Sequence, residues 1–153
     1  MPYYIRRPTK GKPQASKRKR TKSTHTLIAK LDKVFSLFIR LRDSREFKYR
    51  AFRCISCGQV KPFEQADCGH FYSRRHMATR FDEENCHAEC RACNRFSADH
   101  LIAYRENLIR KIGTQHYDLL TMRHAGMRKW SAFELERLIA YYTVLVEKMM
   151  KEK

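Results

Sequence analysis

The clearest chemical signal in the sequence is a set of four cysteines in two Cys-x-x-Cys pairs, Cys54 with Cys57 and Cys90 with Cys93. Each pair can supply one edge of a tetrahedral zinc site, and four thiolates leave no coordination position open for water. The pattern therefore predicts a structural zinc ion. The 32 residues between the pairs exceed the usual spacing of a zinc ribbon, so a whole hairpin must fit between them.

Two further cysteines, Cys68 and Cys86, lie between the pairs. We interpret them as small buried apolar residues. A rival ligand set would combine Cys86, Cys90 and Cys93 with one upstream cysteine. A disulfide framework would need a secreted protein, whereas cysteines paired in this way favour zinc in a reducing compartment.

A histidine and two asparagines lie within or directly after the stretch that the cysteines enclose. His70 belongs to the run ADCGHFY, Asn85 follows fifteen residues later, and Asn94 comes directly after the last cysteine. Hydrolysis of a phosphodiester needs a base that activates water and a cation that neutralises charge on the phosphate. The series therefore favours a metal-dependent nuclease, although His70 can also be a core or zinc-adjacent residue and Asn85 can merely close a turn.

The charge of the chain favours a polyanionic partner. The formal net charge is +17 and the pI is near 10.0, which points to nucleic acid. Arg74, Arg75 and Arg80 lie between His70 and Asn85, where guanidinium groups can hold phosphates; the alternative is simple exposed charge. An anionic membrane surface is the competing polyanion, but no apolar run is long enough to span a bilayer and none resembles a signal peptide. We therefore expect a cytoplasmic protein.

The first 25 residues carry nine basic side chains and no acidic one, including Arg18, Lys19 and Arg20. This composition predicts a disordered arm that binds phosphates. The alternative is a solvated tail that aids solubility.

Hydrophobic periodicity and turn residues predict a mixed α+β protein. The expected organisation is a basic arm over residues 1–25, an amphipathic helix over 26–50, a zinc-braced core over 51–113 and a helical extension over 114–153. Within these, we expect strands at 52–54 and 63–71 and helices at 97–112, 114–124 and from 132 onward. Gly113 should end the first of these helices, and Ser131 with Glu134 should form a capping box. The apolar stripe of the last helix is expected to be core, with a dimer seam as the alternative.

The run GHFYSRRHMATRFDEENCHAECRACN, with Tyr104, Leu108 and Gly113 beyond it, resembles the phage NinG (Rap) recombination-protein family. The series of histidine and asparagines between zinc knuckles resembles the larger HNH, or ββα-metal, nuclease superfamily. The first resemblance covers roughly residues 50–115. It implies a DNA endonuclease of phage homologous recombination that acts on branched DNA, such as Holliday junctions and D-loops, inside the host cell.

The resemblance also implies residue roles. His70 would be the general base, Asn85 would orient it, and Asn94 would be a metal ligand. Many HNH enzymes have an acidic or histidine metal ligand directly before the catalytic histidine, and here that position is Gly69. Asp67, on the same strand face as position 69, is the candidate replacement; Asp82 and Glu83 are the alternatives. Such oxygen ligands suit Mg²⁺ or Mn²⁺.

Two other functions compete with a junction endonuclease. One is a non-catalytic zinc DNA-binding module that protects or remodels recombination intermediates. The other is an HNH nuclease of DNA packaging or restriction, which would cut linear duplex. Paired incisions at a branch favour a homodimer, and other recombination proteins are expected partners.

Overall fold

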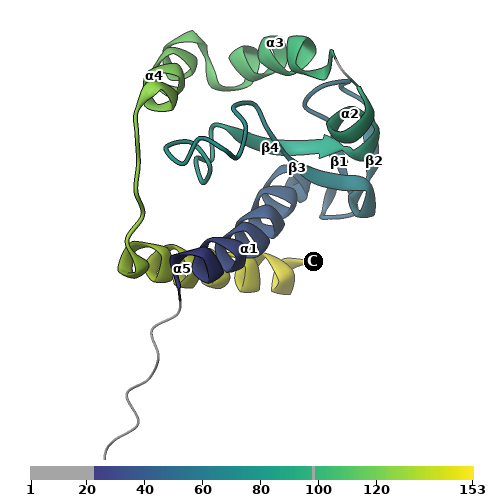
Figure 1. The fold of residues 1–153 in the computed structure, drawn as a ribbon. Coiled ribbons are helices and arrows are strands. Elements are labelled where there is room, and N and C mark those ends of the chain that lie inside the picture. Colours follow the sequence, from purple (N-terminus) through teal and green to yellow (C-terminus); the bar gives the residue numbers. More distant parts are fainter. Residues whose placement is uncertain (1–22, 98) are drawn as a thin grey trace, which may run out of the picture.

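The computed structural model describes residues 23–97 and 99–153. Nearly all of the predicted basic arm, with Arg18, Lys19 and Arg20, therefore lies outside the described residues. Within them the chain forms five α-helices and two small antiparallel sheets, each of two strands (Figure 1). The helices are α1 (Thr24–Ser44), α2 (Arg91–Phe96), α3 (His100–Ile112), α4 (Thr114–Ala125) and α5 (Ala132–Glu152), and the strands are β1 (Ala51–Arg53), β2 (Val60–Pro62), β3 (Ala66–His70) and β4 (Cys86–Cys90).

The N-terminal helix α1 is amphipathic, as predicted, but its boundaries differ. Ser23 caps its start by accepting a hydrogen bond from the backbone N–H of Thr26 at 3.2 Å. It ends at Ser44 rather than near residue 50 and is followed by a short 3₁₀ turn. Lys48 and Tyr49 have φ angles of 51° and 60°, and this left-handed conformation cannot continue a helix.

Helices α1 and α5 lie side by side and form the main apolar core (Figure 1). The capping box of Ser131 and Glu134 is confirmed at the start of α5. The apolar stripe of α5 and the buried residues of α1 belong to one hydrophobic cluster. Its members include Leu135, Ile139, Tyr142 and Val146 of α5 and Leu31, Phe35 and Phe38 of α1. The stripe is therefore core, and its alternative use as a dimer seam is wrong. A homodimer through another surface stays a prediction.

The second sheet is the hairpin that the cysteine spacing required. Strand β3 pairs with β4 so that Asp67 faces Glu89 and His70 faces Cys86. The predicted strand at 63–71 is shorter than expected because residues 63–65 form a 3₁₀ turn. Strand β4 was not predicted from the sequence, although the polar residues His87 and Glu89 alternate with apolar ones along it. All five of its residues are buried.

The chain after β4 forms two helices instead of the single one expected at 97–112. Helix α2 starts directly at Arg91, and Ser97 has extended backbone angles that separate α2 from α3. Gly113 ends α3 with a φ of 82°, as predicted. Helices α3 and α4 lie on the opposite side of the β3–β4 hairpin from α1 and α5 (Figure 1). In the described part of the chain, none of the helices has the length and apolarity needed to cross a membrane.

Candidate metal centre and polar cleft

The four cysteines of the two pairs converge on one point, where the β1–β2 turn meets the end of β4 and the start of α2. One sulfur from each of Cys54, Cys57, Cys90 and Cys93 lies within 4.8 Å of all the others. Gly58 closes the first knuckle with a φ of 71°, which suits glycine. The set is the predicted one, and Cys86 lies in a different group. These four sulfurs can hold a zinc-like ion.

The protonation of these thiols links a metal to the fold. Burial raises the pKa of Cys54 to about 11, and burial also raises the pKa of Cys93. The backbone N–H of Cys90 donates to the sulfur of Cys54 at 3.3 Å, which suits a thiolate. Because zinc binds thiolates, an ion at this centre would release protons and contribute its binding energy to folding.

A second group of residues forms an open polar cleft beside the metal centre. Its volume is about 440 Å³, and its lining comes from α1, β3, α2 and the loop after β3. The residues that line it are Asp32, Phe35, Ser36, Asp67, Cys68, His70, Arg74, Asn94 and Arg95. The structure thus brings Asp67, His70, Asn94 and Arg74 together, although they are spread over 28 positions of the sequence.

Asp67 is one of two carboxylates that line this cleft, and two residues of α2 hold it. Arg95 donates to both carboxylate oxygens, at 2.7 and 2.9 Å, and the amide nitrogen of Asn94 donates at 3.1 Å. Partial burial alone would raise the pKa of Asp67, but the hydrogen bonds from Arg95 and Asn94 outweigh it and lower the pKa. Asp67 is therefore ionised at neutral pH.

His70 ends strand β3 and is half-buried in the cleft. Its Nδ1 lies 3.2 Å from the carbonyl oxygen of Cys68, and its Nε2 lies 3.2 Å from that of Arg80. Burial, and then the positive charge of Arg74, lower the pKa of His70 from its ordinary value of 6.5. The imidazole is neutral at neutral pH, which a general base requires.

Asn85 is fully buried and organises the loop that follows β3. Its side-chain oxygen accepts from the backbone N–H of Tyr72 at 2.7 Å, and its amide nitrogen donates to the carbonyls of Tyr72 and Thr79. Among the described residues it has no hydrogen bond to the ring of His70. Because Thr79 is next to Arg80, whose carbonyl faces His70, any orienting effect of Asn85 passes through this loop.

The three predicted phosphate-binding arginines are placed differently. Arg74 lines the cleft, whereas Arg75 is exposed outside it. Arg80 is paired with Asp32 of α1, with N···O distances of 2.6 and 3.0 Å. Sequence reasoning missed Asp32 and Arg95, because a single charge on a polar helix face gives no local signal. The position of Arg95 directly after Asn94 was the one available hint.

Gly69 has a structural explanation. A Cβ atom at this position would collide with the side chain of Glu89 on the neighbouring strand. Glu89 is fully buried, and its Oε1 accepts hydrogen bonds from Ser56 and from His100. The carboxylate of Glu89 therefore occupies the space into which a side chain at position 69 would extend. The alternatives Asp82 and Glu83 do not line the cleft.

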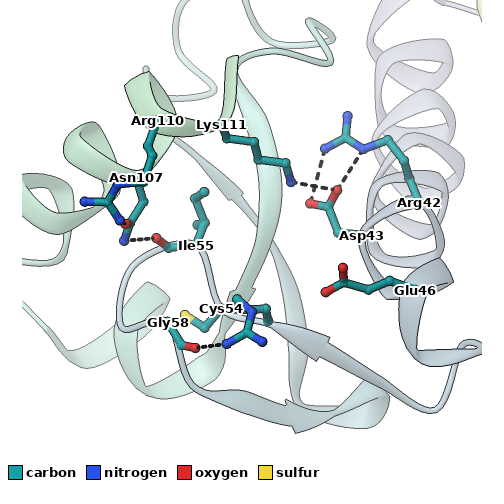
Figure 2. A pocket seen from close by; sticks show the side chains of 10 residues that line it. Arg42, Asp43, Glu46, Cys54, Ile55, Gly58, Asn107, Arg110 and Lys111 are labelled. Atoms are coloured by element: carbon teal, nitrogen blue, oxygen red, sulfur yellow. Dashed lines mark hydrogen bonds and ion pairs between the residues drawn. The ribbon is translucent and has the colours of Figure 1, made fainter. Parts of the chain in front are cut away.

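A larger cleft of about 650 Å³ lies between the end of α1, β1 and α3 (Figure 2). Figure 2 shows Asp43 between Arg42 and Lys111, which donate to it at 2.9 Å and 3.2 Å. Burial alone would raise the pKa of Asp43, but hydrogen bonds from His87 and Arg42 outweigh it and lower the pKa well below its ordinary value. Asp43 also accepts from the backbone N–H of Ala88. These hydrogen bonds connect α1 to β4 and α3.

The arrangement defines a class: a small protein of helices and two short sheets, with a four-cysteine centre suited to a zinc-like metal and a polar cleft beside it. Comparison with known proteins gives the family. The family model described as "Bacteriophage Lambda NinG protein" matches residues 6–152. The chain therefore belongs to the NinG family of phage proteins.

Curated relatives agree with this assignment. The chain is 33% identical over 116 residues to "Protein ninG" of Escherichia phage 933W, which covers 75% of this chain and 54% of the relative. It is 32% identical to that of Escherichia phage lambda and 34% to that of Salmonella phage P22, each over 116 residues, 75% of this chain and 53% of the relative. The chain thus spans about half the length of these relatives. No solved structure matches it significantly.

Proposed function

We propose that this chain is a metal-dependent DNA endonuclease of the HNH, or ββα-metal, type, which cuts branched DNA during phage recombination. The observation that carries the proposal is the convergence of His70, Asp67 and Asn94 on one open cleft. These residues come from a strand, β3, and from the short helix α2 that follows the hairpin. A base, a carboxylate and an amide side by side suit phosphodiester hydrolysis.

The residues of the cleft fit a hard cation such as Mg²⁺ or Mn²⁺. Asp67 is ionised, and the amide of Asn94 lies 3.1 Å from it. The amide nitrogen now faces Asp67, so rotating the amide would turn its oxygen toward the same point. Such an ion would neutralise charge on the scissile phosphate and on the departing oxygen. Arg95 would have to release Asp67 for both of its oxygens to become available.

The protein's own residues have separate tasks in this mechanism. His70, neutral because of burial, would take a proton from the attacking water. Asn85 would maintain the loop that faces His70. Arg74, exposed at the edge of the cleft, would hold a phosphate of the DNA, and the basic arm with Arg18, Lys19 and Arg20 would add affinity that decreases with salt. Arg80 has a weaker claim because Asp32 already neutralises it.

A nicking assay on four-way junctions and on linear duplex, with Mg²⁺ or Mn²⁺, tests the proposal. His70→Ala should reduce the cleavage rate by about 10²- to 10⁴-fold while DNA binding persists. His76→Ala is the matched control, because His76 is exposed and does not line the cleft. If His70→Ala cuts as fast as the wild type, the mechanism is wrong. Equal cutting of linear duplex would favour a packaging or restriction nuclease.

A second candidate is a non-catalytic zinc module that binds recombination intermediates. The bidentate pairing of Asp67 with Arg95 favours it, because this carboxylate is already neutralised. Tight binding of junction DNA with no cleavage in any divalent metal would support this candidate and would contradict the first. In either case the proposed partner is DNA and the proposed location is the host cytoplasm, which membership of a phage family supports.

A further inference from the structure

Cys68 and Cys86, the two cysteines outside the Cys-x-x-Cys pairs, lie beside His70. Cys68 and His70 are two residues apart on β3 and so share a face of the strand, and Cys86 is the partner of His70 on β4. One ligand atom from each of the three lies within 4.8 Å of the others. We propose that these residues form a second metal site, separate from the four-cysteine centre, for a soft divalent ion such as Zn²⁺, Cd²⁺ or Co²⁺.

The ligand set determines which ions would bind. Two thiolates and an imidazole favour zinc, cobalt or cadmium over Mg²⁺, which prefers oxygen. Three protein ligands leave a fourth position for water. Cys68 and His70 both line the polar cleft, so an ion and a water molecule have a path to the site. Cys86 closes the inner side, since it is fully buried.

The contacts of the His70 ring support a ligand role. Both ring nitrogens lie 3.2 Å from a carbonyl oxygen, one of Cys68 and the other of Arg80. A neutral imidazole has a single N–H, so only one of its nitrogens can donate a hydrogen bond to a carbonyl oxygen. The lone pair of the other nitrogen faces an oxygen and forms no hydrogen bond with it. A metal on that nitrogen would use the lone pair, while the remaining N–H would keep its carbonyl and fix the ring orientation.

Occupation of this site would have a consequence for the cleft. An ion bound to His70 removes the lone pair with which the ring would accept a proton from water. Where the proposed nuclease function holds, soft ions therefore inhibit cleavage that Mg²⁺ supports. The metal site itself does not depend on that function, because its ligands and its stoichiometry can be measured without DNA.

Titration with Co²⁺ tests the site in the full chain, stripped of metal and kept reduced under nitrogen. The wild type should bind two ions per chain. Cys68→Ala/Cys86→Ala should bind one, and its thiolate-to-cobalt absorption should fall by about a third because six sulfur ligands become four. His76→Ala, which changes a histidine outside the ligand set, should still bind two. Cooperative thermal unfolding checks that each variant is folded.

Several outcomes would overturn the proposal. If the wild type binds a single Co²⁺ ion per chain, the second metal site does not exist. This result is conclusive even if the double variant does not fold. Binding of two ions by a folded double variant is another. A Cys68–Cys86 disulfide in the unreduced wild-type protein, seen by mass spectrometry, would assign the pair to redox chemistry instead.

An activity assay separates this proposal from the proposed function. With Mg²⁺ present, micromolar Zn²⁺ should inhibit junction cutting by the wild type at least tenfold more strongly than by Cys68→Ala/Cys86→Ala. Equal inhibition would contradict the inhibitory role of the site. If no variant cuts DNA, the nuclease proposal fails, and the Co²⁺ stoichiometry still decides whether the site exists.

Discussion

The four-cysteine centre and the polar cleft are built on the same hairpin, yet they are prepared for ligands in different ways. At the centre, four sulfurs lie within 4.8 Å of one another, so an ion would complete the group. In the cleft, both carboxylates are already paired within the protein, Asp67 with Arg95 and Asp32 with Arg80. A metal in the cleft must therefore compete with these arginines, whereas a metal at the centre must only displace protons.

The largest expected effect concerns Cys57, which is exposed. Without a metal, Cys57→Ser should change the free energy of unfolding by less than about 0.5 kcal/mol, as for other surface changes. With a metal held by four thiolates, the loss should be several kcal/mol, because structural zinc contributes on the order of 10 kcal/mol. Urea unfolding of the wild type and of Cys57→Ser, with and without a chelator, measures this change in the free energy of unfolding. If neither the substitution nor the chelator matters, the centre holds no metal.

Asn94, which lines the cleft, and Asn85, which is buried outside its lining, should differ in their effects on the free energy of unfolding. Asn85→Ala should cost about 2–4 kcal/mol, because it leaves the backbone groups of Tyr72 and Thr79 without partners inside the protein. Asn94→Ala should cost less than about 0.5 kcal/mol, since Asn94 is half-exposed, but should weaken Mn²⁺ binding. Thermal unfolding and Mn²⁺ titration of both variants measure these effects. Similar stability losses would mean that Asn94 is also structural.

Removal of Arg95 tests whether the internal ion pair competes with a cation. Arg95 is 54% exposed, and an exposed pair contributes about 0.2–1 kcal/mol. Arg95→Ala should therefore raise the affinity of the cleft for Mn²⁺ by about two- to fivefold, measured by calorimetry. Arg75→Ala, an exposed arginine outside the cleft, should leave the affinity unchanged. An unchanged affinity in Arg95→Ala would show that Asp67 does not hold the ion.

The smallest effect concerns the pH dependence of His70. Its pKa is lowered below 6.5, so the imidazole stays neutral until the pH falls below that value. The acidic limb of cleavage should therefore have its midpoint below pH 6.5. Stability should also decrease as the pH falls from 6.5 to the folded-state pKa, because the unfolded chain binds the proton more readily. Arg74→Ala should shift the NMR titration of His70 slightly upward, whereas Arg75→Ala should not.

The features that the sequence predicted are local ones. The capping box at Ser131, the stop at Gly113 and the cysteine knuckles each depend on a few neighbouring residues, and all three are confirmed. The partners of Asp67 and Arg80 depend instead on the packing of α2 and α1 against the hairpin, which no short pattern encodes. Gly69 is an intermediate case: the unusual residue was visible, but its cause, the buried side chain of Glu89, required the strand register.

The pairing of α1 with α5 also sets an order of folding. Tyr49, just after α1, donates a hydrogen bond to Glu152 of α5, and these residues are 103 positions apart. At a synthesis rate of about 5–20 residues per second, α5 is completed roughly 5–20 s after α1. The apolar face of α1 has no α5 to pack against until then. During that time the nascent chain exposes Leu31 and Phe35 to chaperones and to other nascent chains. Premature termination before α5 would make this exposure permanent, so such fragments should aggregate or be degraded.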